Sequence, residues 1–136
     1  MNNADIIRGA YGAFKRGDVA AVLSIFDDDI DWVTPGPREL PTAGHRRGRQ
    51  AVAEFFQKLT EAFKVERFEE QEFIEQGNRI VVLGEETLCL RATGRAVEFN
   101  WAHVFDMRDG KVVRFREYGD TAPAVAEIHA AQAMTS

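Results

Sequence analysis

The chain has 136 residues and a net charge of −5, with 22 acidic residues against 17 lysines and arginines. This balance argues against a nucleic-acid partner, which selects a basic surface, and no stretch approaches the ~20 apolar residues of a membrane span. A hydrophobic content of 45% with ten phenylalanines predicts one globular domain, residues 1–136, with a sizeable core or an apolar pocket.

The chemistry-bearing residues are few. A single cysteine, Cys89, excludes an internal disulfide framework and a multi-cysteine metal site. The histidines at positions 45, 103 and 129 are too scattered for metal-ligand spacing, so we expect neither metal nor cofactor. Because the first residues lack a cationic, apolar leader, we expect no secretory signal and a cytoplasmic protein.

The first half of the chain has the apolar periodicity of helices, interrupted by turn residues and prolines. Asp18 can cap the second of these helices. The predicted elements are a helix over about 6–14, a helix after Asp18 that reaches about Phe26, a short strand over 30–33, an irregular loop over 34–47, and a helix from about Arg49 to Phe63.

From Arg67 onward the apolar residues alternate with polar ones, which is typical of strands. Turn pairs at 77–78, 93–94 and 109–110 separate four strand candidates and predict an antiparallel meander. An alanine-rich helix is expected over Pro123–Met134. Helices followed by a long antiparallel sheet indicate an α+β fold with the helices packed on one face of the sheet.

The last two strands place a histidine and a glutamate among aromatic residues. On one strand His103 shares a face with phenylalanine and tryptophan, and on the next Glu117 shares a face with Phe115. The opposite choice would bury Arg114 and Arg116, so we expect His103 and Glu117 to point inward. Glu86, on the preceding strand, is expected to add a second inward carboxyl.

The turn between these strands sets their register. We predict a three-residue loop, 108–110, that pairs Met107 with Lys111 and places His103 opposite Phe115. Glu117 would then lie diagonal to His103, at a Cβ separation of about 7–8 Å. A two-residue loop would oppose His103 to an arginine and split the two apolar faces.

A buried carboxylate must pair, take up a proton or face a wet cavity, because isolated charge is costly to bury. Two interpretations of His103 and Glu117 follow: an acid/base pair at the floor of a pocket, or a satisfied pair that completes the core. Each of the other candidates either lines the cavity or has only a structural role, in core packing or in a turn. These candidates are Tyr11, Trp32, Thr34, Glu86, Phe99 and Trp101.

Three segments resemble the SnoaL-like polyketide cyclases: GAYGAFKRGDVAAVLSIFDDDIDWVTPGP, HRRGRQAVAEFF and AHVFDMRDGKVVRFREYGDT. These enzymes belong to the nuclear transport factor 2 superfamily, alongside ketosteroid isomerases and limonene epoxide hydrolases. The likeness covers about residues 4–125. It implies a curved antiparallel sheet wrapped around N-terminal helices, a deep conical pocket and a homodimer.

The resemblance also implies site residues. The cyclases use a histidine and an acidic residue fourteen positions later, a spacing that His103 and Glu117 reproduce with glutamate in place of the usual aspartate. Glu86 and Leu88 stand where the epoxide hydrolases have arginine and aspartate, so that mechanism is disfavoured. Thr34 stands at the position of the ketosteroid isomerase base and cannot serve as a carboxylate.

The sequence therefore predicts a cofactor-independent acid/base isomerase, cyclase or dehydratase that acts on a hydrophobic carbonyl compound. Its predicted catalytic residues are His103 and Glu117, with the other candidates above as substrate-binding residues. Two alternatives stay open: a non-catalytic binding protein for an apolar metabolite, and a dimeric interaction module. The outer sheet face that would carry the dimer contact includes Val81, Leu83, Ala102, Val104 and Tyr118.

Overall fold

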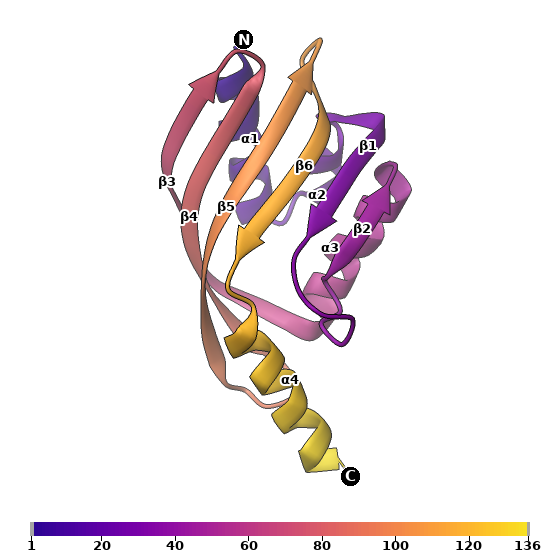
Figure 1. Ribbon diagram of the computed structural model, residues 1–136, viewed down its shortest axis with the longest axis vertical. Helices are drawn as coiled ribbons and strands as arrows, with labels where there is room; N and C mark the ends of the chain where they lie inside the picture. The colour runs from indigo at the N-terminus through magenta and orange to yellow at the C-terminus, as the bar shows by residue number, and fades with distance from the viewer. Residues whose placement is uncertain (1, 136) are drawn as a thin grey trace.

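The computed structural model describes residues 2–135 and consists of helices packed against one curved, unclosed sheet of six strands (Figure 1). The strand order across the sheet is β2-β1-β6-β5-β4-β3. The elements are α1 (Asn3–Lys15), α2 (Val19–Leu23), β1 (Phe26–Thr34), β2 (Gly44–Arg47), α3 (Arg49–Ala62), β3 (Phe63–Gln76), β4 (Arg79–Leu90), β5 (Ala96–Arg108), β6 (Lys111–Gly119) and α4 (Ala122–Thr135).

Helices α1 to α3 lie on one side of the sheet, and α4 extends past the end at which β6 finishes (Figure 1). The side chain of Asn2 caps α1 by accepting a hydrogen bond from the backbone of Asp5 at 2.8 Å. The apolar stripe of α3, which includes Phe55 and Phe56, is buried towards the sheet. Among residues 2–135, no helix combines the length and the apolar character needed to cross a membrane.

The predicted α+β class and the antiparallel meander are confirmed, because β3, β4, β5 and β6 pair in chain order. Several boundaries differ from the prediction. The first strand begins at Phe26 rather than at residue 30, and β3 begins at Phe63 rather than at Arg67. The segment expected to be an irregular loop ends in a short strand, β2, because residues 44–47 pair with the edge of β1.

The register predicted for the β5–β6 hairpin is wrong. The turn has two residues, Asp109 and Gly110, both with positive φ (52° and 78°), as a type I′ turn requires. It pairs Arg108 with Lys111 and Met107 with Val112, and a bulge follows directly after this second pair. The bulge leaves Val113 unpaired and shifts the strands by one residue, so that His103 lies directly opposite Glu117 instead of diagonal to it.

The bulge keeps both aromatic faces together, which a two-residue turn alone would not do. Val112 before it is fully buried and Val113 is only half-buried, the reverse of the expected faces. Beyond the bulge the alternation returns to the expected phase, and Phe115 lies opposite Phe105. One extra residue therefore reconciles the tight turn with an inward-facing aromatic row.

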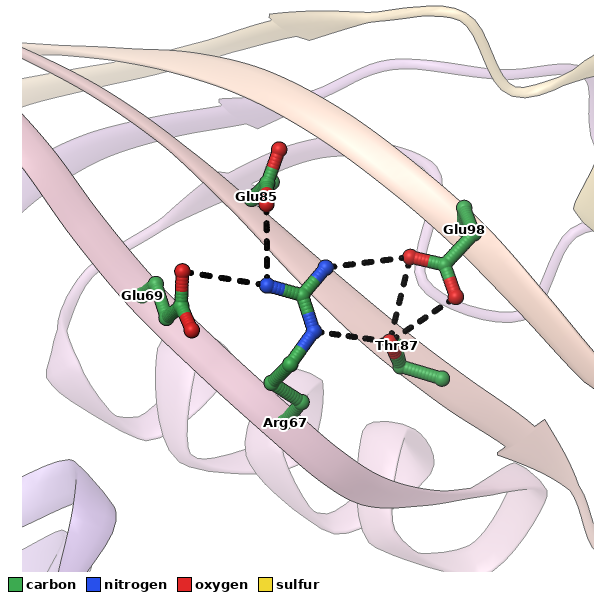
Figure 2. Close-up of polar contacts among 5 residues, drawn as sticks. All are labelled: Arg67, Glu69, Glu85, Thr87 and Glu98. Carbon is green, nitrogen blue, oxygen red and sulfur yellow. Dashed lines mark hydrogen bonds and ion pairs between the residues drawn. The ribbon is translucent and has the colours of Figure 1, made fainter.

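The outer face of the sheet carries a cluster of charges around Arg67 on β3 (Figure 2). The guanidinium donates to Glu85 at 2.9 Å, to Glu98 at 3.1 Å and to the hydroxyl of Thr87 at 3.2 Å, and it forms an ion pair with Glu69. These partners come from three adjacent strands. Exposed ion pairs contribute little to stability individually, but the cluster shows that this face of the sheet is the one turned away from the helices.

Candidate functional site

The inner face of the sheet and the helices surround a cavity of about 120 Å³ that opens to solvent. Phenylalanine is the commonest residue on its walls, with side chains from α1, α3, β1, β3, β5 and β6. Among the described residues that line it, the titratable ones are Tyr11, Glu86, His103 and Glu117. The cavity is therefore an apolar space with a small set of polar groups, the usual composition of a small-molecule site.

His103 and Glu117 form a hydrogen-bonded pair on the wall of this cavity. The imidazole Nε2 lies 2.7 Å from Glu117 Oε2, across the β5–β6 ladder. His103 is only 7% exposed, and the Glu117 side chain is 16% exposed. Both residues point inward because each lies on the aromatic face of its strand.

The phenol of Tyr11 on α1 extends the pair into a chain of three groups. Its hydroxyl lies 2.7 Å from His103 Nδ1. Burial, and after it the nearby negative charge of Glu117 and Glu70, raises the pKa of Tyr11 well above its ordinary value, so the phenol keeps its proton. A neutral imidazole that donates from Nε2 to an ionised Glu117 would leave Nδ1 to accept the proton of Tyr11.

Trp101 lies behind His103 rather than on the cavity wall, where the sequence had placed it. The two rings are stacked, with centroids 3.8 Å apart and planes 9° apart. Glycines flank the indole on both neighbouring strands, since Trp101 pairs with Gly84 on β4 and Gly119 on β6. A Cβ at Gly84 would lie 2.3 Å from the indole. Trp101 thus fixes one face of the imidazole.

Thr34 does not line the cavity either. It is buried, and its hydroxyl donates a hydrogen bond to the backbone carbonyl of Thr42, which closes the loop between β1 and β2. Trp32 does reach the cavity wall, stacked on Phe115 with centroids 4.0 Å apart. Phe99 also lines the cavity, as expected.

Glu86 is a second carboxyl on the cavity wall, 6% exposed. Burial raises the pKa of Glu86 to about 8, and the negative charge of Glu117 adds to the shift. At neutral pH its carboxyl is therefore protonated. Among residues 2–135, no other side chain forms a hydrogen bond or ion pair with it. The neighbouring Glu85 points to the opposite face of the sheet, into the cluster of Figure 2.

Sequence reasoning missed part of the cavity wall. An alternating strand reveals which residues point inward, but nothing in the pattern relates a proline-rich loop or the C-terminal helix to the cavity. In α3, the same apolar stripe describes a packed core and a cavity wall equally well. The missed lining residues include Pro35, Leu40, Thr42, Phe55, Phe56, Phe68, Thr121 and Ala124. Within the described part of the chain, no cluster of three or more histidine, cysteine or acidic residues is placed to hold a metal ion.

Comparison with known proteins agrees with this architecture. Solved structures with the same fold include two nuclear transport factor 2-like (NTF2-like) proteins. One, of unknown function and from Burkholderia pseudomallei, is 30% identical with a TM-score of 0.85 and covers 94% of this chain and 98% of its own. The other, from Burkholderia xenovorans, is 35% identical with a TM-score of 0.81, over 91% and 93% of the two chains.

A third structure, TerC co-crystallised with polyporic acid, is 29% identical with a TM-score of 0.84, over 93% of this chain and 98% of TerC. No protein of curated function matches the sequence. The family profile of the SnoaL-like domain matches residues 7–115, a span that contains Tyr11, Glu86 and His103 and stops two residues before Glu117. On this match and the shared fold, the chain belongs to the SnoaL-like domain family.

Proposed function

We propose that the protein is a cofactor-independent acid/base enzyme, an isomerase, cyclase or dehydratase, that acts on a hydrophobic carbonyl compound. The observation that carries this proposal is the hydrogen-bonded chain Tyr11–His103–Glu117 on the wall of an aromatic cavity. A carboxylate held by an imidazole in an apolar space is suited to proton transfer.

Glu117 acts as the base. Its carboxylate takes a proton from the carbon next to the substrate carbonyl, and the electron pair of the broken C–H bond forms an enolate. Return of the proton to a different carbon gives isomerisation. Attack of the enolate carbon on a second carbonyl forms the new C–C bond of a cyclisation, and the proton then passes from Glu117 to the resulting alkoxide oxygen. His103 orients the carboxylate through Nε2, while Tyr11 at Nδ1 and Trp101 on the ring face hold the imidazole in place.

The cavity supports an apolar substrate that contains rings. Aromatic side chains such as Trp32, Phe99 and Phe115 supply most of the contact surface, and rings pack favourably on such walls. TerC, at 29% identity, was co-crystallised with the small organic compound polyporic acid. That favours a small molecule over a macromolecule as the ligand of this chain as well.

Proton abstraction can be tested before the natural substrate is known. The protein is incubated with 2-tetralone in deuterium oxide, and incorporation of deuterium next to the carbonyl is followed by NMR. We expect protein-dependent exchange that falls by about 10²–10⁴-fold in Glu117→Gln and in His103→Ala. The matched control Glu85→Gln, on the outer face, should keep the rate within about twofold. Exchange that persists in both site variants would overturn the proposal.

A non-catalytic binding protein for an apolar metabolite is the second candidate, because the cavity is far more apolar than polar. In that case 2-tetralone would bind without any exchange beyond the rate in buffer.

We also propose a homodimer formed through the outer sheet face. Val81, Leu83, Ala102 and Val104 are only half-buried there, and Tyr118 is 59% exposed. Light scattering on the purified protein tests this part, and a cytoplasmic location stays a prediction.

A further inference from the structure

Of the titratable groups on the described cavity wall, Glu86 is the one that forms no hydrogen bond with another described side chain; the buried indole N–H of Trp32 on the same wall also has no partner. Tyr11, His103 and Glu117 bind one another, whereas the buried carboxyl of Glu86 faces the cavity with no hydrogen bond to any other described side chain. A buried polar group without a partner costs stability, and the space in front of Glu86 is the cavity itself.

The sheet register separates Glu86 from the acid/base chain. Glu86 pairs with Phe99 on β5, and His103 lies four residues further along the same strand, a backbone separation of about 13 Å. The row between them holds Trp101 with its flanking glycines. Glu86 therefore lies at a different level of the sheet from His103 and Glu117, although it is close enough for the charge of Glu117 to act on its carboxyl.

We propose that Glu86 donates a hydrogen bond to an oxygen atom at the far end of the substrate, so that the ligand is an uncharged ring compound with oxygen atoms at both ends. This inference rests on the proposed function and specifies its substrate class. A protonated carboxyl suits a carbonyl, ether or hydroxyl oxygen, which accepts one hydrogen bond without bringing charge. An anionic group at this end would face the charge of Glu117, which shares the cavity.

The surroundings of Glu86 keep this donor protonated near neutral pH. The other titratable groups of the described cavity wall are Tyr11 on α1, His103 on β5 and Glu117 on β6. The lining residues that α2, α3, β1, β3 and α4 contribute carry no titratable group. With no cation facing Glu86, burial and the charge of Glu117 both raise the pKa of its carboxyl.

Two probes of matched size test the inference: 6-methoxy-2-naphthol and 6-ethyl-2-naphthol, which differ only by an ether oxygen in place of a methylene. Affinities are measured by fluorescence titration near pH 6.5. We expect the wild type to bind the methoxy compound about fivefold more tightly, the worth of one hydrogen bond. Glu86→Gln keeps an N–H donor and should retain the preference, and Glu86→Leu should abolish it. Glu85→Gln is the control and should behave as the wild type.

The preference should also decline in the wild type between about pH 7 and pH 9 as Glu86 loses its proton, but not in Glu86→Gln. Equal affinity for the two probes in the wild type, or a preference that survives in Glu86→Leu, would overturn the inference. If both probes bind and deuterium exchange depends on Glu117, such a result rejects the role of Glu86 alone. If neither probe binds, the proposed function fails together with this inference.

Discussion

Replacing Glu86 by glutamine should make the stability of the fold less dependent on pH. The folded-state pKa of Glu86 is about 8, against an ordinary value of 4.5. Between these values the unfolded chain releases the proton while the folded chain keeps it, so the folded state binds more protons and stability falls as pH rises. The contribution of the protonated Glu86 to the free energy of unfolding is fully present below about pH 4.5 and is lost as the pH rises to about 8.

The magnitude follows from the size of this window. Each pH unit inside it costs about 1.4 kcal/mol, so the wild type should lose about 3 kcal/mol from this group between about pH 5 and pH 7.5. Glutamine at position 86 fills the same space without a titrating proton. The free energy of unfolding of Glu86→Gln should therefore not fall in this way as the pH rises. The difference between variant and wild type should therefore grow by about 3 kcal/mol over that range.

Urea denaturation at several pH values measures the free energy of unfolding of both proteins. Glu85→Gln is again the matched control, because Glu85 lies one residue away on the outer face and is paired with Arg67. Its stability should follow the pH dependence of the wild type. Parallel curves for the wild type and Glu86→Gln would refute the claim that Glu86 is protonated inside the fold.

Two further substitutions test the groups that hold the imidazole. Gly84→Ala places a Cβ 2.3 Å from the indole of Trp101 and should lower the free energy of unfolding by about 1–3 kcal/mol. Its control is Gly9→Ala, in open space on α1, which should raise the free energy of unfolding by about 0.5–1 kcal/mol. A denaturation midpoint for Gly84→Ala equal to the wild type would contradict the tight packing. Tyr11→Phe removes the donor to Nδ1 and should cost about 1–3 kcal/mol in thermal or urea unfolding; an unchanged stability would show that this bond contributes nothing.

Much of the fold could be predicted because strands and helices have different apolar periods. The alternation along β5 and β6 placed His103 and Glu117 on the inner face, and the structure shows both there. That inference needs only the period of two, which is independent of the partner residue. The helical stripe of α3 was equally readable, with its end predicted within about a residue of Ala62.

The register of the last hairpin could not be predicted, because a bulge has no strong signature of its own. Asp109-Gly110 is compatible with both a two-residue turn and a three-residue loop. Requiring both aromatic faces to match selected the longer loop, whereas the protein matches them with a bulge at Val113. The error changed a diagonal contact between His103 and Glu117 into a direct one.

The sequence also could not predict which inward-pointing side chains reach the cavity. Trp101 and His103 lie two residues apart on the same face of β5. The indole stacks on the imidazole, yet only His103 lines the cavity. Which inward side chain meets open space depends on sheet curvature and on where the helices lie. For the same reason the sequence pointed Glu86 inward but could not show that it lacks a partner. The organisation of residues 1–136 as one domain stays a prediction.

The protonation pattern of His103 gives the sharpest test of the acid/base proposal, in which the imidazole holds the Glu117 carboxylate through Nε2. Long-range nitrogen–proton NMR spectra of the ¹⁵N-labelled protein near neutral pH distinguish the two ring nitrogens. The proposed hydrogen-bond chain predicts a protonated Nε2 and an unprotonated Nδ1, with the Nε2 signal shifted in Glu117→Gln. A proton on Nδ1 instead, or an Nε2 signal indifferent to that substitution, would rule out this hydrogen-bond chain.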